Sequence, residues 1–224
     1  MESVSRYGVP APKKKNTGLK IAVSVLIVLI AAVCIVVGLA FSDPYKGSGL
    51  DDVSPSNNLA RTMTESLVTG KENRFSMGDV NAYLSYLFRK DVQGKQSGNV
   101  QIQAVAVAKT SGDSADVYIP FVYQGKRLGL LLNVTPSLDT ASQKLLYRVN
   151  SAHVGRLPVP TSWVLKKAEK HLPAGFWLDG TTVASKAPSL SVSALGVTAS
   201  AGLTEMKLDS GTLALAAKAK LTIR

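Results

Sequence analysis

Cysteine is almost absent from this chain of 224 residues, since Cys34 is the only one. One thiol cannot form an intramolecular disulfide, which excludes the small disulfide-rich folds of secreted proteins. Histidine is nearly as rare, because the chain has only His153 and His171, and their positions lack the spacing of a zinc site. We therefore expect no metal and no other cofactor.

Catalytic motifs are also missing. The sequence contains no G-x-S-x-G, S-x-x-K or P-loop pattern. Gly112-Asp113-Ser114 resembles the start of one hydrolase class, but that class also needs a late histidine and none follows His171. Asp113 and Asp116 flank an expected turn, where solvated carboxylates are common. We therefore expect a protein that is not an enzyme.

Charge of one sign is in excess, because 26 basic residues stand against 15 acidic ones and give a net charge of +11. Nucleic-acid binding would call for clustered basic residues interleaved with aromatic ones. Here the basic residues are scattered and aromatic residues make up only 6% of the chain. We therefore expect no nucleic-acid partner.

One long apolar run covers residues 21–41 and is interrupted only by Ser24 and Gly38. As a helix it would be about 31 Å long, which matches a bilayer core of about 30 Å. Five basic residues precede the run, and acidic residues dominate directly after it. The positive-inside rule then predicts a cytoplasmic tail (1–20), a single-pass transmembrane helix (21–41) and an extracytoplasmic remainder in the cell membrane. A signal peptide cleaved at Gly38-Leu39-Ala40 is the alternative.

The remainder divides into a linker and one domain. Residues 42–55 are rich in Gly, Ser, Pro and Asp, which is typical of a linker. Residues 56–224 are enough for one hydrophobic core. From Ser42 onward the chain carries 21 basic and 14 acidic residues. A basic domain tethered to an anionic membrane is expected to lie close to it.

Apolar periodicity predicts three helices in this domain. The first covers about 56–68 and ends before Gly70, and the second begins at Ser76, where Asp79 completes a capping box. Its apolar stripe is typical of a helix packed on a sheet, and it consists of Val80, Tyr83, Leu84, Leu87 and Phe88. The third helix covers about 161–170, before Pro173.

Period-two alternation predicts strands in the rest of the domain. They cover 100–109, 115–124, 127–134, 144–154, 181–184, 189–200, 205–208 and 212–223, with a loop at 136–142. Pro120 argues for an edge strand or a bulge at its position. The predicted fold class is α+β, an antiparallel sheet packed with two or three helices.

Short patterns in the domain resemble the YpmS-like family. They are residues 154–167 (VGRLPVPTSWVLKK) with 170–173 (KHLP), Ile119-Pro120, 130–136 (LLLNVTP) and 205–211 (EMKLDSG). The members are uncharacterised proteins of Gram-positive bacteria with one N-terminal membrane anchor. The resemblance implies a cell-envelope protein and supplies no catalytic residue.

Apolar surface provides the remaining hypothesis for function. The alanines at 104, 106 and 108, and the residues Leu190, Val192 and Ala194, would leave room under a covering helix. A lipid or another apolar envelope ligand could then lie in a groove between sheet and helix. The helix stripe would form its floor, and Trp163, Phe176 and Trp177 its rim. The alternative is a scaffold with a fully packed core that binds another envelope protein.

Overall fold

A computed structural model describes residues 17–94, 99–172, 175–194 and 197–223 of the chain. Most of the predicted cytoplasmic tail, residues 1–16, lies outside this part. The chain divides into two compact units, Met1–Gly38 and Leu39–Arg224. The first unit contains most of helix α1 (Thr17–Phe41), whose described large apolar side chains from Ile27 to Val37 are 47% to 67% exposed.

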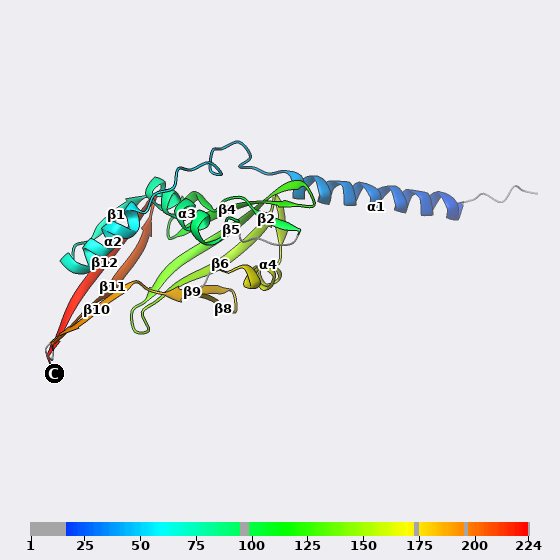
Figure 1. The fold of residues 1–224 in the computed structure, drawn as a ribbon. Coiled ribbons are helices and arrows are strands. Elements are labelled where there is room, and N and C mark those ends of the chain that lie inside the picture. The colour runs from blue at the N-terminus through cyan, green and yellow to red at the C-terminus, as the bar shows by residue number, and fades with distance from the viewer. Residues whose placement is uncertain (1–16, 95–98, 173–174, 195–196, 224) are drawn as a thin grey trace, which may run out of the picture. The chain divides into compact units, whose positions relative to one another are not determined.

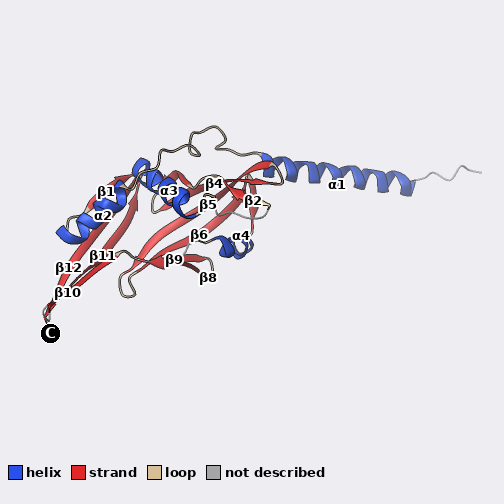
Figure 2. Cartoon of the chain, in the orientation of Figure 1, coloured by secondary structure: helices blue, strands red, loops and turns tan. Residues whose placement is uncertain are grey.

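The second unit contains the other described elements (Figures 1 and 2). Its helices are α2 (Asn58–Thr69), α3 (Met77–Asp91), α4 (Thr161–Ala168) and a 3-10 turn, η1 (Glu169–His171). Its strands are β1 (Asn73–Ser76), β2 (Val100–Ile102), β3 (Ala106–Ser111), β4 (Ser114–Tyr123), β5 (Lys126–Asp139), β6 (Lys144–Val154), β7 (Leu157–Val159), β8 (Phe176–Asp179), β9 (Thr182–Lys186), β10 (Ser189–Ala194), β11 (Val197–Asp209) and β12 (Thr212–Ile223).

The strands form two antiparallel sheets. The larger has the order β2-β4-β5-β6-β9-β8, with β3 also paired to β4 and β7 to β6. The smaller has the order β1-β12-β11-β10. The predicted α+β class with antiparallel pairing is therefore confirmed, but the expectation of a single sheet is wrong.

The chain passes from the larger sheet to the smaller one between β9 and β10, where only Ala187 and Pro188 intervene. Proline has no amide hydrogen and cannot continue a ladder on that side. The Ala187 amide instead donates to the Gln143 carbonyl at 2.8 Å, and the Gln143 side-chain amide donates to the Leu203 carbonyl at 3.1 Å. The turn between β5 and β6 is thereby bonded to both sides of this switch.

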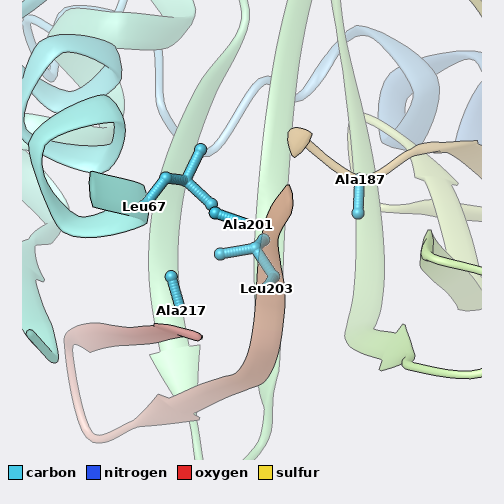
Figure 3. Packing of buried hydrophobic residues seen from close by; sticks show 5 residues of the cluster. All are labelled: Leu67, Ala187, Ala201, Leu203 and Ala217. Atoms are coloured by element: carbon cyan, nitrogen blue, oxygen red, sulfur yellow. The ribbon is translucent and has the colours of Figure 1, made fainter. Parts of the chain in front are cut away.

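A cluster of small and branched side chains fills the junction of the two sheets. Figure 3 shows its buried members, Leu67, Ala187, Ala201, Leu203 and Ala217. Leu138 of β5 and Leu145 of β6 pack against them. Alanine lets the backbones approach closely, so one helix and both sheets share this core. We call these seven residues the junction cluster.

The predicted cap at Gly70 and the predicted capping box at Ser76 are confirmed. Gly70 follows α2 in the left-handed conformation, and its amide donates to the Ser66 carbonyl at 2.7 Å. At the start of α3, the Asp79 amide donates to the Ser76 hydroxyl at 3.2 Å, and the Ser76 amide donates to the Asp79 carboxylate at 3.0 Å. These two bonds form the capping box.

The expected strand 100–109 is two strands, because the ladder stops at 103–105, opposite Pro120. Pro120 is not on an edge, since β4 lies between β5 and the strands β2 and β3. Its missing amide hydrogen is accommodated by the interruption of the neighbouring strand, where the Gln103 amide donates to the Pro120 carbonyl at 2.8 Å. Pro120 thus correctly indicated an irregularity in the sheet, but the irregularity is an interruption of the neighbouring strand instead of an edge or a bulge at Pro120.

Two further boundaries differ from the prediction. The expected loop 136–142 is mostly strand, because β5 continues to Asp139 through ladder pairs with β6. The expected strand 189–200 is two strands, β10 and β11, which pair with each other as a hairpin. Residues 195–196, between the two strands, lie outside the described part. Strand β11 also includes the expected strand 205–208. Strands β1, β7 and β8 were not predicted.

Candidate functional site

All five residues of the predicted groove floor on α3 are buried or half-buried. Val80 and Tyr83 pack against the buried residues Leu59, Phe75 and Leu215. This burial raises the pKa of the Tyr83 phenol. Leu84 and Leu87 are half-buried, and Phe88 is buried. These side chains hold α3 on the domain.

A hollow lies beside the C-terminal half of α3. Its volume is about 190 Å³, and Phe88, Ser85 and Leu50 are among its lining residues. Sites for small molecules usually measure about 300–1,000 Å³. The hollow is therefore smaller than a usual small-molecule site.

The predicted rim residues lie on separate surfaces. Phe176 and Trp177 are neighbours in β8, so they point to opposite faces of the sheet. The Phe176 ring lies 6.5 Å from the Tyr147 ring, and the Lys144 amine lies 5.8 Å from the Trp177 ring centre. Trp163 lies on α4 and is 55% exposed. The structure does not bring the eight predicted residues into one site.

Trp163 shares the exposed face of α4 with lysine residues. Val164 and Leu165 are the buried residues of this helix, and Leu165 packs with Val134 and Val149 of the larger sheet. Residues 163, 166, 167 and 170 recur at helical spacing, and all four are exposed. They are Trp163, Lys166 and Lys167 of α4 and Lys170 of the adjoining turn η1, and we call these four residues the α4 face.

A buried polar network, which the sequence analysis missed, fixes the predicted linker on the larger sheet. The Tyr118 hydroxyl donates to the Asp43 carboxylate at 2.6 Å, and only 3% of the Asp43 side chain is exposed. An Arg127 guanidinium nitrogen lies 2.9 Å from the Asp51 carboxylate, and another lies 3.4 Å from the Tyr118 hydroxyl. The rings of Tyr45 and Tyr118 are 5.4 Å apart. Residues 42–52 are therefore part of the folded domain, and we call them the docked segment.

The network shifts the pKa values of titratable groups within it, Tyr118 and Asp51 among them. Burial, and then the hydrogen bond to Asp43, raise the pKa of Tyr118 to about 12. The hydrogen bond from Arg127 lowers the pKa of the Asp51 carboxyl. Neutral Tyr118 and ionised Asp51 are therefore the forms that the folded domain favours.

The turn between β6 and β7 contacts the residues just before the docked segment. The Arg156 amide donates to the Leu39 carbonyl at 2.9 Å. A Cβ atom at Gly155 would collide with the Leu39 and Ala40 carbonyl oxygens. Gly129 plays a similar part on β5, where a Cβ would lie 2.8 Å from the Asp43 carboxylate and the Tyr118 ring. Glycine at these two positions leaves room for the chain to lie against the sheet.

Asn81 was also missed, although it anchors α3. Its amide group donates to the Val107 carbonyl at 3.0 Å and accepts from the Val107 amide at 2.6 Å. The Asn81 amide group thus makes the two hydrogen bonds that the backbone of a further strand would make at the edge formed by β3. A polar residue among apolar neighbours on α3 was the available signal, whereas nothing in the sequence near Asp43 indicated Tyr118 or Arg127.

Among the residues that the structure describes, no helix is both long and apolar enough to cross a membrane. The same part of the chain contains no group of three or more His, Cys, Asp or Glu residues that could hold a metal ion.

Comparison with known proteins adds no relative. No family model, no curated protein and no solved structure matches the chain. The YpmS-like resemblance therefore stays a prediction, and the function has to be argued from the chain itself.

Proposed function

We propose that the protein is a non-enzymatic binding module, anchored in the cell membrane by residues 21–41, with its folded domain outside the cytoplasm. Its domain binds another component of the envelope through its outer surface. The docked segment is the observation that supports this proposal most. Because the first residues after the proposed anchor belong to the fold, no long free linker separates the domain from the end of the anchor.

The side chains of α1 support the anchor. From Ile27 to Val37 these side chains are apolar and exposed, so outside a membrane they would contact water. A helix that is apolar on all sides is stable where its surroundings are apolar too. The charge difference between the two ends of the run supports the orientation with the domain outside.

The contacts of Leu39 and Ala40 favour a retained anchor over a cleaved signal peptide. Cleavage after Ala40 would remove the carbonyl group that accepts the Arg156 hydrogen bond. It would also remove the backbone against which Gly155 packs. Residues that complete a fold are poor candidates for a segment that is discarded.

The packing of α3 supports binding through the outer surface. Val80 and Tyr83 contact core residues, so the predicted groove floor serves the core at these positions. The groove for a lipid stays a prediction. The packed alternative, in which the domain binds another envelope protein, agrees better with these contacts.

Cysteine labelling tests the topology. The change Cys34→Ser gives a chain without cysteine, into which Ser48→Cys or Ser3→Cys is introduced. A membrane-impermeant maleimide should label Ser48→Cys in intact cells, and Ser3→Cys only after permeabilisation. The reverse pattern, or release of the chain by alkaline carbonate, would contradict the proposed anchor.

Photo-crosslinking in intact membranes tests the binding role. A photoreactive residue is placed at the exposed positions Ser48, Trp163 and Lys207. The buried position Leu203 serves as the control, where only crosslinks within the chain are expected. One dominant adduct from a single exposed surface supports an interaction module, and the absence of any adduct at all three counts against it.

A further inference from the structure

We propose that the α4 face binds the anionic headgroups of the bilayer in which the protein is anchored. This inference rests on the proposed function, because it requires Leu39 to lie where the chain leaves the membrane. It names a second contact between the domain and the membrane, made by side chains far from the anchor in the sequence.

The chemistry of the α4 face matches an anionic interface. Trp163, at 55% exposure, is the most exposed aromatic side chain among the large hydrophobic residues described in the domain. Tryptophan is favoured at the headgroup level, where its ring meets apolar and polar groups together. Three exposed lysines surround it at helical spacing. Lysine near an anionic leaflet gains from its surface potential.

The opposite side of α4 leaves this face open. Val164 and Leu165 are buried, and Leu165 packs on Val134 and Val149. The helix is thus fixed by its apolar side, and Figure 1 shows it beside β6. Glu169, the acidic residue of the adjoining turn, follows Lys166 by three residues, so one carboxylate stands against the three lysines. The face therefore has a net positive charge.

The chain path brings α4 close to the membrane exit. The Arg156 amide is bonded to the Leu39 carbonyl at the end of the apolar run. Helix α4 begins five residues after Arg156, so the two are separated by at most about 18 Å. The headgroup layer and the screened field of a charged leaflet extend together to about 15 Å from the hydrocarbon core. A chain path of this length allows the start of α4 to lie inside this layer, which is the position that the proposal requires.

Tryptophan quenching by brominated lipids tests the inference on the full chain in vesicles. The chain has only two tryptophans. The variant Trp177→Phe leaves Trp163 as the single reporter, and Trp163→Phe leaves Trp177 as the matched control. The vesicles contain brominated phosphatidylcholine, with or without phosphatidylglycerol. We expect quenching of Trp163 to rise at least about twofold with phosphatidylglycerol, and quenching of Trp177 to stay constant.

A charge variant tests whether the lysines attract the anionic lipid or whether Trp163 merely lies near the bilayer. Replacing Lys166, Lys167 and Lys170 with Gln should abolish the rise caused by phosphatidylglycerol. Equal quenching of Trp163 in both vesicles, or a rise that survives the three substitutions, would overturn the inference. So would a protein adduct that protects Trp163 in native membranes. A chain that alkaline carbonate releases would overturn the anchor and this inference together, whereas a retained chain with unquenched Trp163 overturns this inference alone.

Discussion

The junction cluster and the docked segment are held by opposite kinds of interaction. The cluster joins α2 and the two sheets through apolar side chains, of which five are buried and two are partly buried. The docked segment is held by carboxylates, a phenol and a guanidinium, and the Asp43 side chain is nearly as buried as Leu203. Both regions connect parts of the chain that are distant in the sequence.

The two kinds of interaction have different consequences, one for the stability of the domain and one for the position of the docked segment. Apolar burial stabilises any arrangement that removes the same area from water. A buried carboxylate is tolerated only where its hydrogen-bond donors are in place, so it selects one arrangement. We infer that the junction cluster stabilises the whole domain, whereas the network determines where the docked segment lies.

The largest effect is expected in the junction cluster. Replacing Leu203 with Ala should lower the free energy of unfolding by about 2–5 kcal/mol, because the side chain is buried in a shared core. Denaturant unfolding of the full chain in detergent measures the loss. The control is Val68→Ala on α2, where the side chain is 65% exposed and the change should be small. Equal losses for the two variants would contradict the role of the cluster.

The next effect concerns the turn that contacts Leu39 and Ala40. Gly155→Ala adds a methyl group where two carbonyl oxygens lie, so the docked segment should be released while the sheets remain folded. Gly112→Ala is the matched control, because φ is +57° at Gly112 and +60° at Gly155, but Gly112 has open space around it. Each variant should lose about 1–2 kcal/mol through backbone strain alone. Limited proteolysis between residues 42 and 52 should distinguish them, and equal resistance would show that the contact is unimportant.

A smaller effect is expected from Tyr118→Phe. The change removes the hydroxyl that donates to Asp43 and leaves a buried carboxylate short of a donor, which costs about 1–3 kcal/mol. Tyr123→Phe, at a 41% exposed position, provides the control. Hydrogen exchange should quicken in the docked segment of the first variant only. If exchange quickens equally in β11 and β12, the network supports the whole fold and the comparison between the two regions fails.

The smallest effect is a change with alkaline pH. The pKa of Tyr118 is raised from 10.0 to about 12 in the folded domain, so the folded state favours the neutral phenol. Its contribution is fully present below pH 10 and is lost as the pH rises through about 12. Proteolysis of the docked segment should therefore accelerate over this window, and Tyr118→Phe should remove that part of the acceleration. A pH profile that the substitution leaves unchanged would exclude Tyr118 as its cause.

Local signals in the sequence predicted much of the fold. The capping box at Ser76 and Asp79 and the cap at Gly70 depend on neighbouring residues, and both were found. The change of sheet at Ala187 was not predicted, because the alternation of a strand does not indicate which sheet the strand joins. Strand β5 was cut short at Pro136, since the ladder pair of that residue with Tyr147 leaves no mark in the sequence.

The predictions for the site were limited in the same way, because local patterns do not show which distant residues come into contact. The stripe on α3 correctly indicated a helix with a packed face, but periodicity does not tell whether a ligand or the core covers it. Asp43 and Tyr118 are 75 residues apart, and a loop rich in Gly, Ser and Asp looks like a linker when its partners are unknown. Trp163 was named as a rim residue, and the lysines that share its face were named only for their effect on the helix end.

Hydrogen exchange of the full chain in a bilayer tests the central claim most directly. The amides of Tyr45, Ser48 and Asp52 donate to oxygen atoms within the docked segment, and the Arg156 amide donates to the Leu39 carbonyl. The account predicts that peptides covering 42–52 exchange slowly, together with those covering the turn at Gly155 and Arg156, and that Tyr118→Phe accelerates the first set. Exchange of residues 42–52 at the rate of an unfolded chain would contradict it, because the domain would then hang from its anchor on a free linker.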